Sequence, residues 1–392
     1  MTKHLFILIL SVFAYSVSFG QEYLNKYYRA EIALKKSDTL SAISIYDKIK
    51  EDHPNDFTSS LRLAEIYYQL KQFEDATSNA SNAEIILLKK KQKLSDANTA
   101  QVLKKNLTID QDLASIYHLK GKIELKAQNW QTAEKNLVEA YQLYPDNEEV
   151  LIDLGIVKFH QSGVDSATWW FEKAIQQNSL SHLAYYNLAK IYLNDGRDSL
   201  GEQFLKKAIQ IKRNFTPAYY PLAKLYLVQK NYDQASEYYQ TLINLNEKST
   251  LVYHNLAFAL LNSGQSNEAI QYWQKALEKD STDATLLENL AITFLKTQNY
   301  KDATEITSRL IQLENSEYNL LLHAYALILN KESKAAISIT KRFKNNPKAR
   351  YYQSLAFLQL GKIKKACRMF KKSLKLGFEA ENANEKLQSL CN

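Results

Sequence analysis

The chain has 392 residues, of which 45% are hydrophobic and 23% charged, and its formal net charge is +8. This positive excess is modest for the length, so the composition argues against a nucleic-acid-binding protein. A single compact core would be unusual at this length, whereas stacked helical units need no central core.

The N-terminal segment differs in composition from the rest of the chain. Lys3 precedes an apolar run from Leu5 to Phe19, and small residues lie before Gln21. We expect residues 1–20 to be a cleavable signal peptide, so that the mature protein is exported to the periplasm, the cell surface or the medium and has no membrane span. The alternative is an uncleaved anchor, although about 15 apolar residues are short for a span of about 20.

A small residue then returns with a fixed period. Ala189, Ala223, Ala257 and Ala291 are each 34 residues apart. Within each period apolar residues recur three and four positions apart, which predicts an amphipathic helix followed by a second one. Small residues allow two helix axes to approach to about 8 Å, so we expect these alanines at helix crossings.

The period divides the chain into about ten helix pairs, which begin near residues 23, 57, 114, 148, 182, 216, 250, 284, 316 and 350. The domains expected from it are residues 1–20 (signal peptide), 21–90 (units one and two), 91–113 (a helical insertion), 114–349 (units three to nine) and 350–392 (the last unit and a C-terminal cap). Pro347 is expected to mark the end of a second helix. The first helix of the last unit is expected to be shortened before Gly361.

The insertion over residues 91–113 interrupts the period just after the lysines Lys89 and Lys90. Few helix breakers occur there, so the segment is expected to extend the neighbouring helices. One interpretation is a prolonged helix with a solvated charged face. The other is a docking surface for an acidic partner or a membrane, because insertions in repeat arrays often mark a binding face.

Only two cysteines occur, Cys367 and Cys391, and both lie in the last unit. In an oxidising compartment a disulfide between them would pin the C-terminal cap; the alternative is two free thiols. Neither cysteine has a His, Cys or acidic neighbour at metal-ligand spacing, so no metal site is expected.

The 34-residue period, with small residues at the crossings and a polar-aromatic turn such as Asn231-Tyr232 between helices, resembles the tetratricopeptide repeat. The resemblance implies an all-α fold, a right-handed α-solenoid of about ten helix-turn-helix units. It covers nearly the whole chain after residue 20. It is specific for the fold and says little about the partner, because this solenoid serves many functions.

In that family the first helix of each unit lines a concave groove, and its groove positions imply a set of candidate peptide-binding residues here. Tyrosines offer flat apolar area and lysines offer cations, which favours an acidic segment or a C-terminal carboxylate. The set is His118, Lys122, Lys126, Tyr186, Asn187, Lys190, Asn194, Tyr220, Lys224, Asn255 and Phe258.

Asn187, Asn255 and Asn289 occupy the family's sixth position and partly resemble the asparagines of carboxylate-binding members. The alternative is that these amides make local hydrogen bonds, as most polar side chains do. Toward the C-terminus the groove is expected to become more apolar, through Phe258 and then Ile292.

No catalytic motif is present: the sequence lacks a Gly-rich phosphate loop, G-x-S-x-G and H-E-x-x-H, and its seven His are scattered. We therefore predict a non-enzymatic scaffold of the bacterial envelope, without a cofactor, that binds a protein or peptide partner. One alternative is a structural subunit that assembles through its convex face or end repeats. Another is an enzyme or carbohydrate-binding protein whose site is assembled by curvature. The partner and the oligomeric state stay open.

Overall fold

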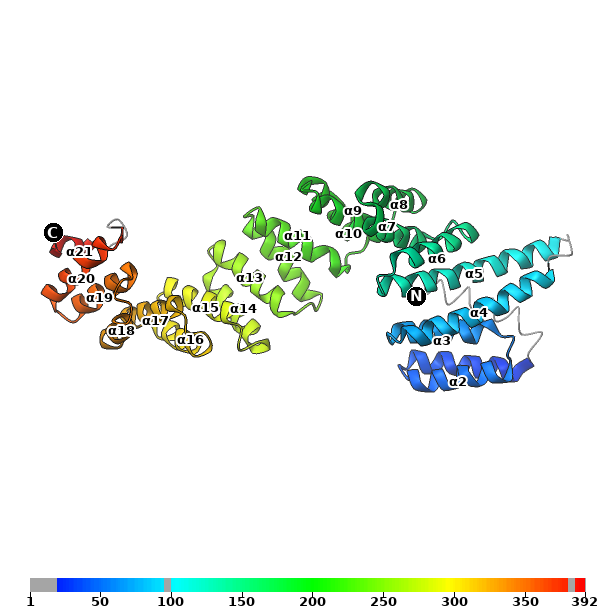
Figure 1. Ribbon diagram of the computed structural model, residues 1–392, viewed down its shortest axis with the longest axis horizontal. Helices are drawn as coiled ribbons and strands as arrows, with labels where there is room; N and C mark the ends of the chain where they lie inside the picture. The colour runs from blue at the N-terminus through cyan, green and yellow to red at the C-terminus, as the bar shows by residue number, and fades with distance from the viewer. Residues whose placement is uncertain (1–19, 95–99, 380–384, 392) are drawn as a thin grey trace. The chain divides into compact units, whose positions relative to one another are not determined.

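The structure, a computed structural model, describes residues 20–94, 100–379 and 385–391 (Figure 1), so the predicted signal peptide lies outside the described residues but for Gly20. Within these ranges the chain forms helices joined by turns, without a strand. The chain divides into an N-terminal body, Met1–Ile211, and a C-terminal body, Lys212–Asn392. Each body is described by itself.

The N-terminal body begins with a helix over residues 20–35. Its other helices are α2 (Thr39–Asp52), α3 (Phe57–Gln69), α4 (Phe73–Leu94), α5 (Ala100–Lys126), α6 (Trp130–Leu143), α7 (Glu148–Ser162), α8 (Val164–Gln177), α9 (His182–Asn194) and α10 (Asp198–Ile211).

The C-terminal body continues the same alternation. Its helices are α11 (Thr216–Val228), α12 (Tyr232–Asn244), α13 (Thr250–Asn262), α14 (Ser266–Lys279), α15 (Ala284–Lys296), α16 (Tyr300–Leu313), α17 (Glu317–Leu329), α18 (Ser333–Thr340), α19 (Pro347–Gln359), α20 (Ile363–Lys375) and α21 (Glu385–Cys391). Successive helices pair antiparallel, which confirms the prediction of an all-α solenoid of helix-turn-helix units.

Each turn within a helix pair is made by one residue in the left-handed region. In most of them a Schellman motif follows, as where Gln72 N donates to the Tyr67 oxygen (2.9 Å) and Lys71 N to the Tyr68 oxygen (3.1 Å). Four of the turn residues are glycines and six are not, although only glycine adopts this conformation without strain. With φ between 59° and 87°, they are Ser37, Lys71, Gln128, Gly163, Gly196, Lys230, Gly264, Gln298, Lys331 and Gly361.

Most of the first helices begin at a capping side chain. Asp56 accepts hydrogen bonds from the backbone amides of Thr58 (3.1 Å) and Ser59 (3.0 Å), which satisfies two of the amides left free at the start of α3. The same role is played by Asn147, Ser181, Ser249, Asp283, Ser316 and Asn346.

The small residues predicted at helix crossings are buried. Ala189, Ala223, Ala257 and Ala291 are all 0% exposed. At the equivalent position of the fourth unit stands Gly155, where an added Cβ would lie 2.5 Å from Cε1 of Phe171. Helix α7 therefore packs on α8 more closely than an alanine allows.

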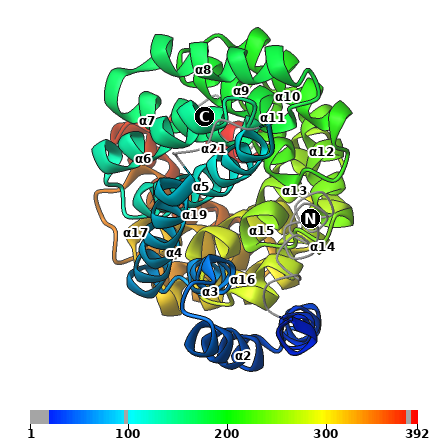
Figure 2. The same ribbon diagram turned by 90° about the vertical axis from the view of Figure 1, so that its right-hand side faces the viewer.

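Helices α4 and α5 are longer than the others, with 22 and 27 residues against 13 to 15 in the neighbouring α3, α6 and α7. Figure 1 shows the pair extending together as a helical projection beyond α3, and Figure 2 views the molecule from that side. Lys91 Nζ lies 2.5 Å from Asp110 Oδ1 and ties the two helices. Part of the predicted insertion, residues 95–99, lies outside the described residues.

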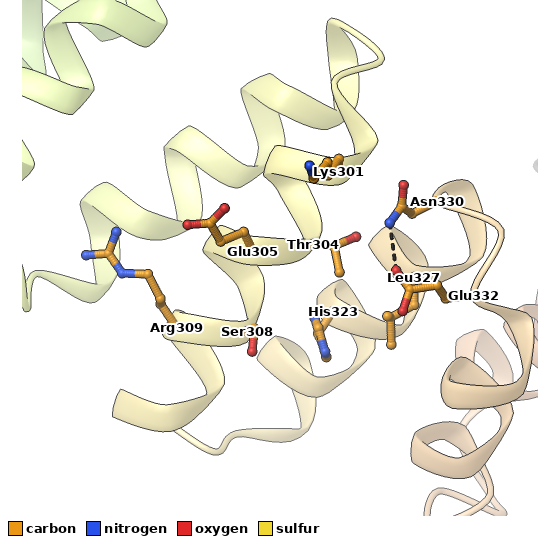
Figure 3. Close-up of a pocket in the computed structure, with 9 residues that line it drawn as sticks. All are labelled: Lys301, Thr304, Glu305, Ser308, Arg309, His323, Leu327, Asn330 and Glu332. Atoms are coloured by element: carbon orange, nitrogen blue, oxygen red, sulfur yellow. Dashed lines mark hydrogen bonds between the residues drawn. The ribbon is translucent and has the colours of Figure 1, made fainter.

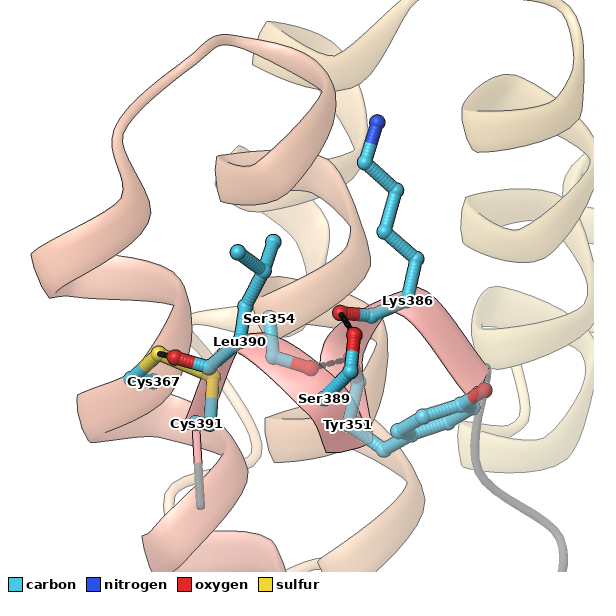
Figure 4. Close-up of a disulfide and its surroundings, with 7 residues drawn as sticks. All are labelled: Tyr351, Ser354, Cys367, Lys386, Ser389, Leu390 and Cys391. Carbon is cyan, nitrogen blue, oxygen red and sulfur yellow. Dashed lines mark hydrogen bonds between the residues drawn. A yellow bond between two sulfur atoms is a disulfide. The ribbon is translucent and has the colours of Figure 1, made fainter.

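The C-terminal helix α21 is joined to α20 by a disulfide between Cys367 and Cys391 (Figure 4). Leu387 and Cys391 are buried against Phe370, so α21 covers the end of the apolar core. The Leu390 carbonyl oxygen lies 3.6 Å from Sγ of Cys367. This is a van der Waals contact, because an oxidised sulfur has no proton to donate.

Two local expectations from the sequence are wrong. Helix α19, the first helix of the last unit, has 13 residues, and the short helix is α18, with 8 residues. Pro347 does not end a second helix but stands in the first turn of α19. That position suits proline, because its missing amide hydrogen would have no partner there.

None of the described helices combines the length and the apolar character needed to cross a membrane.

Candidate peptide-binding surfaces

In the N-terminal body, α3, α5 and α7 bring four polar or aromatic side chains together. His118 Nε2 lies 2.8 Å from Asp153 Oδ2, with side-chain exposures of 9% and 18%. Lys122 Nζ lies 5.6 Å from the ring centroid of Tyr68. Burial, and then the charge of Asp153, raises the pKa of Tyr68. His118 is therefore engaged and buried, which leaves Lys122 and the exposed Lys126 as the accessible cations.

Helix α9 carries the next group of predicted residues. Lys190 is exposed, and its Nζ lies 5.6 Å from the centroid of the half-buried Tyr186 ring. The Asn187 amide donates to the Leu183 carbonyl oxygen at 2.9 Å, within its own helix. Asn194 is exposed in the last turn. The accessible groups of α9 are thus the Lys190 ammonium beside an aromatic ring and the side-chain amide of Asn194 at the end of the helix.

In the C-terminal body, the Asn255 amide donates to the Tyr220 hydroxyl at 3.1 Å, between α13 and α11. The Tyr220 ring also makes an edge contact with Tyr239, at 5.9 Å between centroids. Asn289 bonds only to its own helix, at the Thr285 oxygen. The three asparagines therefore do not act alike: Asn187 and Asn289 bond locally, whereas Asn255 joins neighbouring units.

The contacts His118–Asp153 and Tyr220–Asn255 are equivalent, since each joins residues 35 apart in sequence. That separation is one repeat period plus one residue. It places the fifth position of a unit against the sixth position of the next. Polar groups at these positions therefore hold adjacent first helices together.

The first helices of the C-terminal body expose large apolar side chains. Val228 is 70% exposed, Leu251 and Tyr318 are 54% exposed, and Phe258 is 36% exposed. Single exposed apolar residues are common on protein surfaces, but four large ones occur here on α11, α13 and α17. Groups of exposed apolar side chains are typical of interaction sites. Lys224, on α11, is the exposed cation among the predicted residues of this body.

Aromatic rings continue this row. The rings of Tyr325 and Tyr352 stack at 5.1 Å, which joins α17 to α19. Tyr318 donates its hydroxyl to Glu288 Oε1 at 2.8 Å. Burial raises the pKa of Tyr352 to about 12, so the ring acts as a neutral apolar group. The first-helix face of this body is therefore rich in aromatic and apolar groups, with Lys224 and Glu288 among its charged ones.

A separate shallow cavity of about 640 Å³ lies between α16 and α17 (Figure 3). Its lining carries both signs of charge: Lys301 and Arg309 are basic, and Glu305 and Glu332 are acidic. The Glu332 carboxylate accepts a hydrogen bond from the Asn330 amide at 2.7 Å. This mixture favours no single ligand charge.

His323 forms the buried base of that cavity, with 8% of its surface exposed. Its Nδ1 lies 2.8 Å from the Thr307 hydroxyl, which also donates to the Ala303 oxygen at 2.7 Å. Burial lowers the pKa of His323. Earlier units have leucine before the crossing alanine, as in Leu256-Ala257, so His323-Ala324 is a polar replacement at an apolar position.

Sequence reasoning expected an increasingly apolar groove and named Phe258, but it missed Val228, Leu251 and Tyr318 of the apolar row and the polar base at His323. The same groove positions, carried into every later unit, would have found Leu251, Tyr318 and Tyr325. A comparison of equivalent positions would have found His323 in place of leucine. Across the described ranges, no group of three or more His, Cys, Asp or Glu side chains could hold a metal ion.

Comparison with known families finds repeat models in the second half of the chain. Three tetratricopeptide-repeat models match residues 182–215, 200–257 and 250–283. The model described as anaphase-promoting complex, cyclosome, subunit 3 matches residues 296–373. No curated protein matches the chain.

Three solved structures to which the chain is similar have low sequence identity to it. A tetratricopeptide repeat protein from Parabacteroides merdae is 16% identical, covers 72% of this chain and 100% of its own, and has a TM-score of 0.40. For Pseudomonas aeruginosa pilF the values are 19%, 54%, 96% and 0.45. For YrrB, described as a TPR protein with an unusual peptide-binding site, they are 16%, 54%, 94% and 0.37. These values assign no partner and no activity.

Proposed function

The chain belongs to the tetratricopeptide-repeat family, and we propose that it is a non-enzymatic interaction scaffold of the bacterial envelope. In this proposal a peptide segment of a partner protein lies along the first helices of the repeats. Members of such repeat arrays present extended binding surfaces, because each unit contacts only its neighbours and the first helices follow one another.

The observation that carries the proposal is the apolar row Val228, Leu251, Phe258 and Tyr318 on the first helices of the C-terminal body. Burying such side chains against a partner would contribute about 25 cal/mol per Å² of apolar area removed from water. The row is nearly uncharged, so we infer that an apolar or aromatic part of the peptide contacts it.

The exposed lysines of the candidate set supply the second part of the proposal. Lys190 Nζ lies 5.6 Å from the Tyr186 ring centroid, and Lys224 follows Tyr220 at the same spacing of four residues on another first helix. Cations held beside aromatic rings suit a carboxylate. From Lys224 and the apolar row of the same body we therefore infer a peptide with acidic side chains or a free C-terminal carboxylate, as well as apolar ones; Lys190 would bind a carboxylate on the N-terminal body by itself.

The envelope setting is inferred from two features. One is the basic and apolar composition of residues 1–20, which is typical of an export signal. The other is the disulfide between Cys367 and Cys391, since disulfides persist mainly in oxidising compartments.

The test is in-cell crosslinking followed by mass spectrometry, with the full chain carrying Lys190→Glu and Lys224→Glu. A matched control carries Lys135→Glu and Lys279→Glu, which reverse exposed lysines on the second helices α6 and α14. We expect the specific partners of the wild type to disappear in the first variant and to persist in the control.

A third variant, Leu251→Asp with Phe258→Asp, tests the apolar row. It is expected to lose the same partners. If all partners survive both groove variants, the first helices are not the binding surface and the proposal is wrong.

The structural-subunit alternative is favoured by one observation, an exposed tryptophan on a second helix. Trp169 on α8 is 54% exposed, and Lys173 Nζ lies 4.8 Å from its ring centroid. Exposed tryptophans are frequent anchors of protein interfaces. Analytical ultracentrifugation over a range of concentrations, with Trp169→Ala as the variant, would reveal an oligomer that the groove variants leave unchanged.

A further inference from the structure

The positive charge of the chain is concentrated near its C-terminus. Residues 331–378 contain 14 of the 50 Lys and Arg but only one acidic residue, Glu332. That segment therefore carries +13, whereas the remaining residues together carry −5. The net charge of +8 hides this separation of sign.

The cations gather on α20 and on the loops beside it. Helix α20 and its N-cap residue hold half of them, spaced three and four positions apart so that they share one face. The opposite face, with Ala366, Met369 and Phe370, is buried in the core. The seven are Lys362, Lys364, Lys365, Arg368, Lys371, Lys372 and Lys375.

The other seven cations border α18 and α19, which belong to the same body. Most are exposed, and Arg350 is half-buried and bonds to neutral groups, the Lys344 oxygen and the Gln353 amide oxygen. They are Lys331, Lys334, Lys341, Arg342, Lys344, Lys348 and Arg350. We call these 14 residues the basic end.

Among the described residues, no ion pair joins a carboxylate to a cation of the basic end. In the part of the chain that the structure describes, every ion pair lies between Glu22 and Lys206. Like charges held this close repel one another, and the repulsion is relieved when an anionic surface approaches. Within the described residues, the basic end is therefore a positively charged surface without an ion pair.

We propose that the basic end docks the scaffold on the surface of an anionic lipid bilayer. Clusters of Lys and Arg bind such surfaces electrostatically. Eleven of the 14 are lysines, which act as point charges rather than as the bidentate forks by which arginine recognises single carboxylates or phosphates. The cations spread over the three helices α18, α19 and α20 and their loops, which matches a sheet of charge better than a single extended peptide.

Two further features favour a lipid surface. Ile363 and Leu376, at the two ends of α20, are 48% and 39% exposed and can enter the headgroup region beside the lysines. The disulfide of Cys367 on the same helix argues against a nucleic acid as the polyanion, because oxidising compartments rarely hold one.

The proposal goes beyond the peptide-binding function. The apolar row lies on first helices, whereas most of the basic end lies on the second helix α20 and the loops after α18. Docking by the basic end would therefore leave the first-helix face of the same body for a protein partner.

The test is flotation of the full chain with vesicles of phosphatidylcholine alone or mixed with phosphatidylglycerol. We expect binding to the mixed vesicles at low salt and none to the neutral ones. Binding should weaken strongly when the salt is raised until the Debye length falls from about 30 Å to about 8 Å.

The variant Lys364→Gln, Lys371→Gln, Lys375→Gln is compared with Lys35→Gln, Lys135→Gln, Lys279→Gln, which removes the same charge from exposed lysines elsewhere. Each cation near an anionic bilayer contributes about fivefold to binding, so the first variant should bind on the order of 100-fold more weakly. The control should bind nearly as the wild type does.

Absence of binding to mixed vesicles at low salt would overturn the proposal, as would equal losses in the two triple variants. Poly-L-glutamate serves as a competing probe. If it binds with the same dependence on α20 while the vesicles do not, the basic end serves an acidic polypeptide and the membrane proposal is wrong. The Lys190→Glu, Lys224→Glu variant should still float, which separates this test from that of the peptide-binding surface.

Discussion

The close packing of α7 on α8 leads to a quantitative prediction for Gly155→Ala. An alanine usually stabilises a helix interior by about 1 kcal/mol relative to glycine. Here its Cβ would lie 2.5 Å from Cε1 of Phe171 and 2.8 Å from Cδ1 and Cζ. Ordinary contacts need about 3.5 to 4 Å, so the ring must move by about 1 Å.

Phe171 has little room for that movement, because it is 1% exposed and packs among Leu151 and Ile152. Overpacking of a filled core costs about 1 to 3 kcal/mol, which outweighs the helix-propensity gain. We therefore expect Gly155→Ala to lower the free energy of unfolding by about 1 kcal/mol.

A double-mutant cycle with Phe171→Leu isolates the cause. Alone, Phe171→Leu should cost about 1 kcal/mol through lost apolar contact. In a chain that already carries Gly155→Ala it should cost less or nothing, because the fifth unit holds Ala189 and Leu205 at the same two positions. The expected coupling is about 1 to 2 kcal/mol in favour of the double variant.

The assay is urea unfolding followed by tryptophan fluorescence, since Trp130, Trp169 and Trp170 all report from the third and fourth units. Additivity within about 0.3 kcal/mol would refute the packing argument. So would a Gly155→Ala variant that is more stable than the wild type.

Three other predictions concern single features of the fold. Cys367→Ser with Cys391→Ser should destabilise the last unit by about 3 kcal/mol, the loop-closure value for a separation of 24 residues, measured by hydrogen exchange of α21. Lys230→Gly should stabilise the chain by about 0.5 to 1 kcal/mol, because Lys230 holds φ at 60°, and an unchanged urea midpoint would contradict this. Burial lowers the pKa of His323. Its contribution to stability is therefore present above the unfolded pKa of about 6.5 and lost as the pH falls through the folded pKa. His323→Leu should flatten the decline of stability below pH 6.5, and an identical pH profile would contradict the burial argument.

The architecture was predictable because close helix packing requires small residues at fixed positions of the sequence. Two helices cross closely only where a side chain is nearly absent, so Ala223 and Ala257 had to recur with the period of the helix pair. The left-handed turn residues were less visible. Lys71 and Gln128 carry no such signal, because their conformation is imposed by the helices on either side.

The candidate site was predictable only in part, since a groove position does not say what a side chain contacts. His118 was predicted to face a partner, and the structure pairs it with Asp153 of the next unit. Finding that pair requires the rule that contacts between units span one period plus one residue. The basic end was missed for another reason: the net charge averages over segments of opposite sign.

The placement of ion pairs implies that salt acts on the two bodies with opposite sign. The N-terminal body holds the described ion pairs, including Arg62 with Glu31 and Glu65, and screening weakens such attractions. The basic end holds cations for which no ion pair is described, and screening weakens their mutual repulsion. Added salt should therefore loosen the first body slightly and tighten the last two units. An anionic bilayer would act on the basic end as salt does, but locally, so docking and stabilisation of α20 should rise and fall together.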